Sequence, residues 1–267
     1  MSGVFSLLHE NLQKALTARN WQPTPIQNSA IPEIINGKSR LLIAPTGSGK
    51  TLSAILPILH RCIAEDWQPL SVLYITPLRA LNRDVDRRLQ EIADSVGLRV
   101  GLRHGDTTQS ERAKQVRKPP HILVTTPETF QLMFTGKNLR KLLATVKAVI
   151  VDEVHDLAAS ERGWQLSVGL ARLEALSGEK VQRIGLSATV GNPQQVAKWL
   201  SDDGEAIIET GKRVTEIFVE TEFPTSEDET GGIEYAIPSR AHAIFRQVIS
   251  IIEKDAPCLL FVNSRSD

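Results

Sequence analysis

The sequence predicts an α/β fold in which a mostly parallel sheet carries helices on both faces. From residue 37 to about residue 208, short β-rich runs alternate with amphipathic helical stretches, which is typical of βαβ crossovers. Runs such as Ala148–Val151 are apolar at consecutive positions, as expected of a strand buried on both faces. Polar and glycine-rich residues follow several of these runs, at the strand ends where open parallel sheets bind ligands.

The strands and helices of this region can be placed in order along the chain. The expected strands are Leu41–Ala44, Val72–Thr76, Val100–Arg103, Ile122–Thr125, Ala148–Val151 and Arg183–Ser187. Two clear helical stretches are Leu78–Val96 and Gln165–Leu176, because their apolar residues recur with the spacing of a helix face. An earlier helix is expected to begin at Pro25, since proline suits the first position of a helix.

The last part of the chain has a different pattern. The segment Val214–Glu220 alternates apolar and polar residues, as a half-buried strand does, and the acidic segment Glu222–Gly232 suggests an exposed loop. Pro238 then opens a helical pattern, and Cys258–Val262 resembles a strand. Because so few elements cannot close a core, we predict a first domain over residues 1–211 and an incomplete second domain over residues 212–267.

Composition limits the classes of protein to which the chain can belong. Its 267 residues suffice for one large or two small domains. The 31 Lys and Arg residues balance the 31 Asp and Glu residues, so any basic surface must be local. Cys62 and Cys258 lie too far apart to indicate a disulfide framework or a metal-binding motif. Nothing resembles a signal peptide or a membrane span, so we expect a reduced, cytoplasmic setting.

The segment Ala44–Thr51 predicts a phosphate-binding loop between a strand and a helix. Its glycines let backbone N–H groups close around a polyphosphate, and the helix N-terminus adds a positive dipole end. Lys50 would reach the outer phosphates, and the Thr51 hydroxyl would bind Mg²⁺. The alternative is a simple strand-to-helix turn, and Ala44 stands where the motif normally has glycine. The residues expected to hold the nucleotide are Thr46, Gly47, Ser48, Gly49, Lys50 and Thr51.

Two adjacent carboxylates follow the most apolar strand and suit the chemistry of a magnesium nucleotide. Asp152 could hold the coordination shell of the metal through its bound waters, since Mg²⁺ prefers oxygen ligands and keeps several waters. Glu153 could orient and deprotonate an attacking water. The alternative is a solvated pair of charges at a strand end. His155 has no second ligand at metal-binding spacing, so it is expected to link the nucleotide site to the rest of the protein through hydrogen bonds.

Six short motifs in order resemble the first RecA-like motor domain of superfamily 2 helicases with a DEVH box. The matching segments are Thr24-Pro25-Ile26-Gln27, Ala44–Thr51, Thr76–Leu81, Thr126-Pro127-Glu128, Asp152–His155 and Ser187-Ala188-Thr189. Asn263-Ser264-Arg265 resembles the first motif of the second motor domain. Within the superfamily, Arg162–Ser167, Ile184–Pro193 and Ala197–Leu200 are most similar to the Lhr (large helicase-related) proteins.

This resemblance implies roles for residues that spacing alone does not define. Gln27, with Thr24, is similar to the motif that reads adenine, and an amide offers both a donor and an acceptor. Trp21 and Phe5 are both candidates for stacking on the base. Ser187 and Thr189 resemble the motif that couples hydrolysis to strand movement, although two hydroxyls could also cap the next helix.

The resemblance also implies contacts with one strand of nucleic acid at Arg79, Gly105 and Thr126. Such motors grip phosphates through Arg, hydroxyls and backbone N–H groups, which gives little sequence preference and a marked salt dependence. Other basic clusters, such as Arg112 and Lys114, fit a solvated helix face at least as well.

Together the motifs lead us to expect the motor of an ATP-dependent helicase or translocase, with ATP and Mg²⁺ as cofactors and DNA as the favoured partner. An RNA helicase or remodelling ATPase of the same superfamily, or a nucleotide-gated binding module without useful catalysis, are the alternatives. An arginine of the second RecA-like domain would complete the site and is expected beyond residue 267. We therefore expect the isolated chain to bind adenine nucleotides weakly and to hydrolyse ATP slowly.

Overall fold

A computed structural model describes residues 3–77, 89–209, 221 and 223–254 of the chain. The chain divides into two compact units, Met1–Lys212 and Arg213–Asp267.

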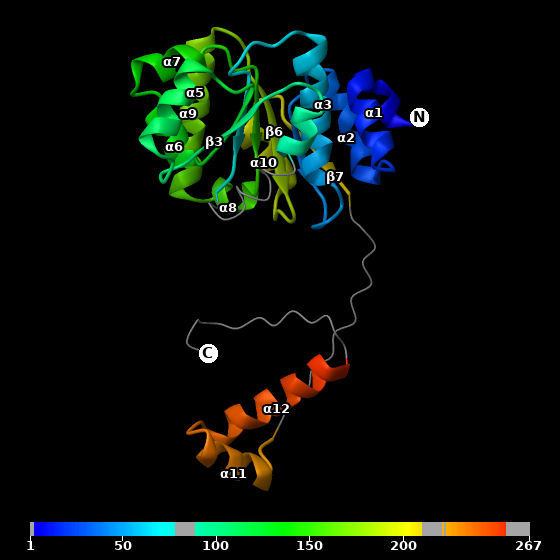
Figure 1. The fold of residues 1–267 in the computed structure, drawn as a ribbon, viewed down its shortest axis with the longest axis vertical. Helices are drawn as coiled ribbons and strands as arrows, with labels where there is room; N and C mark the ends of the chain where they lie inside the picture. The colour runs from blue at the N-terminus through cyan, green and yellow to red at the C-terminus, as the bar shows by residue number, and fades with distance from the viewer. Residues whose placement is uncertain (1–2, 78–88, 210–220, 222, 255–267) are drawn as a thin grey trace. The chain divides into compact units, whose positions relative to one another are not determined.

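The first unit alternates strands and helices along most of its length (Figure 1). Its elements, in order, are the 3-10 helix η1 (Val4–Leu7), α1 (Glu10–Ala18), α2 (Pro25–Ile35), β1 (Arg40–Ile43), α3 (Lys50–Ala64), β2 (Val72–Ile75), β3 (Val100–Arg103), α5 (Gln109–Arg117), β4 (Ile122–Thr125), α6 (Pro127–Met133), α7 (Lys137–Leu143), β5 (Ala148–Val151), α8 (Val154–Ala158), α9 (Glu161–Ser177), β6 (Gln182–Ser187), α10 (Pro193–Leu200) and β7 (Glu205–Ile208).

The described strands form one sheet in the order β3-β4-β2-β5-β6-β1-β7, and every neighbouring pair is parallel. Strand β6 lies between β1 and β5, so the loop after β1 and the residues after β5 emerge at one edge of the sheet, two strands apart. This is the edge at which open α/β sheets bind ligands.

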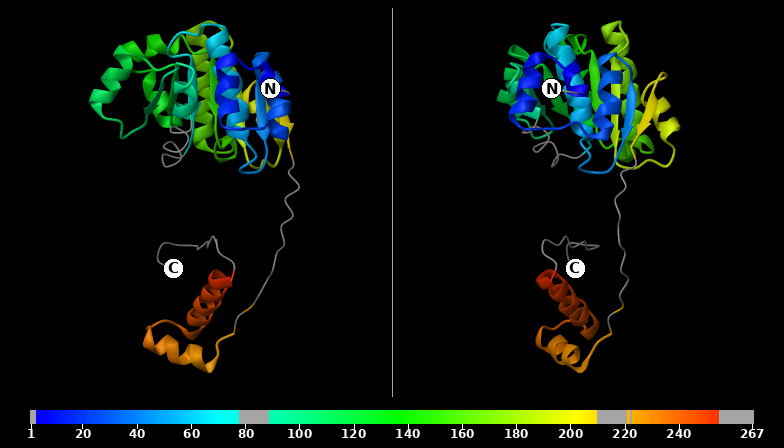
Figure 2. Two further views of the ribbon diagram at one scale, coloured as in Figure 1. Left: turned by 45° about the vertical axis from the view of Figure 1, so that its right-hand side comes forward. Right: turned by 90° about the vertical axis from the view of Figure 1, so that its right-hand side faces the viewer.

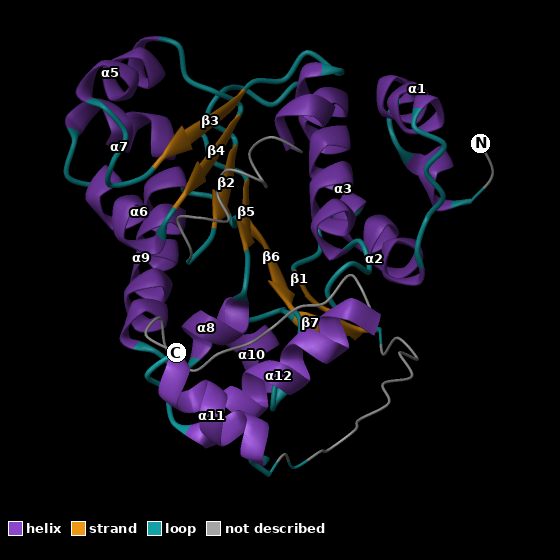
Figure 3. Ribbon diagram, turned by 60° about the horizontal axis from the view of Figure 1, so that its bottom comes forward, coloured by secondary structure: helices purple, strands orange, loops and turns teal. Residues whose placement is uncertain are grey.

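Helices cover both faces of this sheet. Figure 3 shows α2 and α3 on one face and α6, α9 and α10 on the other, and a rotated view shows the same sandwich (Figure 2). Side chains of successive strand residues enter two separate cores. Tyr74 and Ile150 pack with α1–α3, whereas Leu73 and Val149 pack with the helices of the opposite face. The α/β fold predicted from the sequence is therefore confirmed.

All six predicted strands are present, with shifts of no more than one residue at their ends. Strand β7 was not predicted, because it is only partly buried at the edge of the sheet and carries a weaker apolar pattern. The helix expected over Leu78–Val96 is observed at residues 89–94, and residues 78–88 lie outside the described part. The helix expected at Gln165–Leu176 is α9, which begins four residues earlier because Ser160 caps it.

The loop predicted over Glu222–Gly232 is wrong, because the structure has helix α11 at Ser226–Glu234. Thr225 and Asp228 form a capping box: Thr225 N donates to Asp228 Oδ2 over 2.9 Å, and Asp228 N donates to the Thr225 hydroxyl. Three acidic residues in the first turn also stabilise the helix, because their negative charges lie at the positive end of its dipole. Glycine serves packing here, since a Cβ at Gly231 would lie 2.2 Å from the His242 ring.

Helix α12 (Ser239–Lys254) confirms the helical pattern that follows Pro238. Asp228 is fully buried between α11 and α12, where it accepts hydrogen bonds from Arg246 and lies 2.9 Å from His242 Nδ1. Hydrogen bonds from Arg246, and then from His242 and Thr225, hold the pKa of Asp228 well below its usual range. The strands predicted at Val214–Glu220 and Cys258–Val262, and the motif Asn263-Ser264-Arg265, lie outside the described residues.

None of the helices in the described part of the chain combines the length and the apolar composition needed to cross a bilayer.

Candidate active site

The loop from β1 to α3 forms a tight glycine-dependent turn. Gly47 and Gly49 have φ angles of +81° and +93°, a left-handed conformation that glycine adopts without steric cost. Ser48 N donates to the carbonyl of Pro45 over 3.2 Å, which closes the turn. Thr46 and Gly47 are exposed at its tip, and Lys50 and Thr51 form the first turn of α3. The strand, loop and helix predicted for Ala44–Thr51 are therefore present.

The Lys50 ammonium lies at the base of this loop. Its Nζ donates to the carbonyls of Ala44 and Pro45, the latter over 3.0 Å. Burial lowers the pKa of Lys50, and the negative charges of Glu153 and Asp152 oppose that effect. Lys50 of the loop thus lies close enough to Asp152 and Glu153, about a hundred residues away in the sequence, for their charges to act on it.

The two carboxylates stand directly after β5. Asp152 N donates to the carbonyl of Ile75 over 2.8 Å, which anchors this residue to the end of β2. Asp152 Oδ1 accepts a 3.0 Å hydrogen bond from Glu153 N. Glu153 has φ 46° and ψ 49°, a left-handed conformation that is uncommon for a residue with a side chain and that occurs more often at functional sites. It turns the chain sharply from β5 into α8.

Burial sets the electrostatics of this pair. It raises the pKa of Asp152, while hydrogen bonds from Tyr74 and from the Glu153 N–H, and the charge of Lys50, lower it. It also raises the pKa of Glu153, and the neighbouring charge of Asp152 adds to the rise. Two carboxylates that share a partly buried site therefore depend on nearby positive charge to remain ionised.

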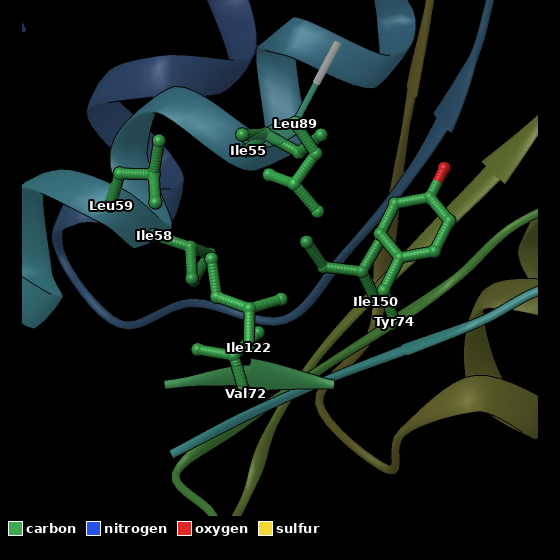
Figure 4. Close-up of a pocket in the computed structure, with 8 residues that line it drawn as sticks. All are labelled: Ile55, Ile58, Leu59, Val72, Tyr74, Leu89, Ile122 and Ile150. Carbon is green, nitrogen blue, oxygen red and sulfur yellow. The ribbon is translucent and has the colours of Figure 1, made fainter. Parts of the chain in front are cut away.

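Tyr74 supports Asp152 from the centre of β2. Its hydroxyl donates to Asp152 Oδ2 over 2.5 Å, and its ring is fully buried. Figure 4 shows the ring in an apolar pocket with Ile55, Val72 and Ile150, and its hydroxyl points away from Val72. Burial raises the pKa of Tyr74 well above its usual value, and the charge of Asp152 and the hydrogen bond to it add to this rise. Tyr74 thus holds Asp152 from the buried side of the sheet.

Gln27 contacts the phosphate-binding loop directly. It is buried on the first turn of α2, where its Oε1 accepts from Thr24 N over 3.1 Å and its Nε2 donates to the carbonyl of Gly49 over 3.3 Å. A Cβ at Gly49 would lie 2.5 Å from Gln27 Nε2, so only glycine permits this approach. Of the two aromatic candidates, Phe5 is buried in the core, whereas Trp21 is 36% exposed.

His155 and Ser187 connect the end of β5 to the end of β6. His155 Nδ1 lies 3.0 Å from Ser187 Oγ and 3.4 Å from Glu153 Oε2. Because the Ser187 hydroxyl donates its single proton to the carbonyl of Thr189 over 3.0 Å, we assign the proton between His155 and Ser187 to Nδ1 of the histidine. The alternative role of Ser187 and Thr189 as a helix cap is wrong, since Asn192 caps α10.

The residues expected to contact nucleic acid lie at other strand ends along the same edge. Gly105 is exposed after β3, and Thr126 follows β4. Thr126 is 4% exposed, and its hydroxyl accepts from Thr129 N over 3.3 Å as the cap of α6. Arg79 lies outside the described residues.

Sequence reasoning missed three side chains that hold this edge together. Tyr74 is one of them. Arg112, treated as part of a surface cluster, instead donates to the carbonyls of His104, Gly105 and Thr107 and so shapes the Gly105 loop. Arg162 joins the ends of β2 and β4. The only available signal for Tyr74 was a hydroxyl in an otherwise apolar strand, and the contacts of the arginines depend on distant segments.

A parallel sheet with a glycine-rich loop after β1 and paired carboxylates after β5 defines the class as a RecA-like nucleoside-triphosphatase fold. The chain belongs to the DEAD/DEAH box helicase family, which matches residues 24–196. The motif-based recognition of a superfamily 2 motor domain is therefore confirmed.

The comparisons with individual proteins also confirm the predicted similarity to Lhr proteins. The chain is 37% identical over 98% of its length to the ATP-dependent helicase Lhr-Core protein 2 of Thermococcus barophilus, and spans 33% of that relative. It is 44% identical over 68% of its length to the Lhr helicase/uracil glycosylase of Escherichia coli, and spans 13% of that protein. The structure of Mycobacterium smegmatis helicase Lhr bound to ssDNA and AMP-PNP aligns with 99% of this chain, with a TM-score of 0.79 and 34% identity, and 35% of that chain is covered.

Proposed function

We propose that this chain is the ATP-hydrolysing motor region of a helicase that moves along single-stranded DNA. The observation that carries the proposal is the meeting of Lys50 with Asp152 and Glu153 at the carboxyl edge of the sheet. Because the chain spans about a third of the length of its Lhr-Core relatives, the activity of the whole protein is part of this proposal. DNA is favoured because the aligned Lhr structure is bound to ssDNA.

The residues of the loop fit a magnesium nucleotide. The hydroxyl of Ser48 is buried without a hydrogen-bond partner in the described structure, so this donor of the loop is available to a phosphate oxygen. Thr51 and Asp152 supply the oxygen ligands that Mg²⁺ prefers. Among the described residues no group of three or more His, Cys, Asp or Glu side chains is placed to hold a metal.

Each of these residues has a task in hydrolysis. Lys50 exchanges its carbonyl partners for phosphate oxygens and neutralises their charge. Glu153 orients the attacking water and accepts its proton, and the electrostatic influence of Asp152 and Lys50 on its carboxylate supports this role. When bound, Mg²⁺ would supply electrostatic stabilisation of the triphosphate. Gln27 reads the adenine edge while its contact with Gly49 ties base recognition to the loop.

A hydrogen-bonded chain then leads from hydrolysis to movement. It begins at Glu153, which lies at ion-pairing distance from His155. His155 lies at hydrogen-bonding distance from Ser187, and the Ser187 hydroxyl donates to the carbonyl of Thr189. A change of charge or position at Glu153 therefore acts on the end of β6. Residues 212–267 are proposed to begin the second RecA-like domain. That domain would act together with the carboxyl edge of the sheet in ATP hydrolysis.

The test is the replacement Glu153→Gln in the full-length protein, which preserves size and removes the base. We expect ATP turnover to fall by about a hundredfold or more while ATP affinity is retained, because general-base catalysis contributes on that scale. Glu161→Gln, an exposed residue of α9, is the matched control and should leave turnover unchanged. Unchanged turnover in Glu153→Gln would favour a nucleotide-gated binding module instead.

The choice of nucleic acid is tested in the same assay. Turnover is measured without polymer, with single-stranded DNA and with RNA of equal length. Stimulation by DNA supports the proposal. Stimulation by RNA alone would assign the protein to the RNA-remodelling alternative.

A further inference from the structure

Arg162 joins the segments that follow β2 and β4, two neighbouring strands of the sheet. It is the second residue of α9, and its Nε donates to Glu128 Oε1 over 2.6 Å. Its Nη2 donates to the carbonyl of Pro77 over 3.0 Å. One planar guanidinium therefore ties the residue that follows Thr76 to the first turn of α6, which begins after Thr126.

The start of α9 is itself fixed against α8. Gly163 packs so closely that a Cβ would lie 1.9 Å from the carbonyl oxygen of Leu157. Ser160 accepts from Gly163 N over 3.3 Å and donates to that same carbonyl over 2.9 Å. Because α8 begins directly after Glu153, the position of Arg162 is tied to the segment that carries the proposed base.

A second contact fixes α9 against α6. A Cβ at Gly169 would lie 2.4 Å from Gln131 Nε2, and Gln131 also donates to the carbonyl of Gln165. Helix α9, which carries Arg162, therefore packs closely against both α8 and α6, and these contacts fix the position of the guanidinium.

We propose that Arg162 is a positioning residue for nucleic-acid binding, which holds the Pro77 and Glu128 strand ends in the mutual arrangement that one strand of DNA requires. The inference rests on the proposed function, because these two ends belong to the segments expected to contact the DNA backbone. Arg162 acts through its two acceptors and does not need to touch a phosphate. Through Arg162 and the contact of α8 with α9, the ends of β2 and β4 are connected to the start of α8.

The test uses Arg162→Gln, Glu128→Gln and the double variant, with binding of a labelled oligo(dT) followed by fluorescence anisotropy at several salt concentrations. We expect Arg162→Gln to weaken binding about tenfold, equivalent to roughly 1.4 kcal/mol. Glu128→Gln should weaken binding in the same direction although it removes a negative charge. The double variant should be no weaker than Arg162→Gln, because both substitutions break one contact.

The salt dependence separates positioning from direct contact. A side chain that pairs with a phosphate lowers the slope of affinity against salt by about one when it is removed. We expect the slope to be unchanged in Arg162→Gln, and Arg162→Lys to restore only part of the affinity, since an ammonium cannot span both acceptors as a planar fork does. Arg140→Gln, at an exposed position of α7, is the charge-matched control and should bind as the wild type.

AMP-PNP affinity and the urea unfolding midpoint are measured for every variant and should match the wild type. The inference alone would be overturned if Arg162→Gln bound oligo(dT) as the wild type does. It would also be overturned if Arg162→Gln reduced the slope of affinity against salt by one while Glu128→Gln bound normally. A parallel loss of AMP-PNP affinity and stability would overturn it as well. A wild-type protein that binds AMP-PNP but not oligo(dT) would overturn the inference together with the proposed DNA motor.

Discussion

The hydroxyl of Tyr74 donates a 2.5 Å hydrogen bond to Oδ2 of Asp152. The two residues belong to neighbouring strands, β2 and β5, and the bond joins positions 78 residues apart in the sequence. It fixes the carboxylate rotamer of Asp152 from the core side of the sheet. Asp152, the proposed magnesium ligand, is thus oriented by a side chain that cannot itself reach solvent.

Removing that hydroxyl with Tyr74→Phe should destabilise the protein and impair hydrolysis. Because the ring remains in its apolar pocket, the change isolates the hydrogen bond to a carboxylate, worth about 1.5–3 kcal/mol. Urea unfolding measures the loss, and ATP turnover should fall with it. Tyr235→Phe, the same change at an exposed residue, should alter neither. Wild-type stability and turnover in Tyr74→Phe would refute the role.

Gln27→Glu should weaken nucleotide binding and reduce the preference for adenine. The replaced Nε2 would become an oxygen facing the carbonyl of Gly49, which turns a hydrogen bond into repulsion. Titrations with ADP and GDP measure both effects. Asn28→Asp, on the adjacent exposed position, makes the same chemical change away from the loop and should keep the wild-type preference. Equal affinities of wild type and Gln27→Glu would contradict the adenine-reading role.

Gly163→Ala should destabilise the first unit although alanine normally favours a helix. The added methyl would overlap the carbonyl oxygen of Leu157, so α8 and α9 must separate, at a cost of about 1–3 kcal/mol. Thermal or urea unfolding tests this directly. Gly191→Ala is the matched control, since a Cβ there meets nothing within 4 Å and should be neutral. If both variants unfold alike, the close approach of α8 and α9 is not as described.

Stability should fall as the pH drops below about 6.5, the ordinary pKa of histidine. His121 Nδ1 accepts a 3.0 Å hydrogen bond from Arg99 N, so folding requires the neutral ring. Burial lowers the pKa of His121, and the positive charge of Arg99 lowers it further. The folded pKa lies below the unfolded one, so the unfolded state binds more protons in this window and the free energy of unfolding decreases with acidification.

The replacement His121→Asn keeps an acceptor and removes the titration, so it should flatten the pH dependence of the urea midpoint. Part of the slope should remain, because burial and then the charge of His9 also lower the pKa of His60. A slope identical to that of the wild type would exclude His121 as its source.

Much of the site was predictable because its signals are local. A strand, two left-handed glycines and a lysine at a helix start occupy consecutive positions, and β5 is apolar up to Asp152. The prediction failed where local composition and packing disagree. The glycines near residue 231 suggested a loop, but they serve a close helix–helix contact in α11.

The sequence by itself determined which segments become strands, where the phosphate-binding loop lies and which carboxylates follow β5, because each depends on residues adjacent in the chain. Only the tertiary structure decided that β6 separates β1 from β5, that Tyr74 orients Asp152 and that Arg162 reaches Pro77 across 85 positions. Such contacts are made by side chains whose neighbours are set by strand order and helix docking. Short-range sequence patterns carry no record of that order, since the chain between two strands can cross to more than one neighbour.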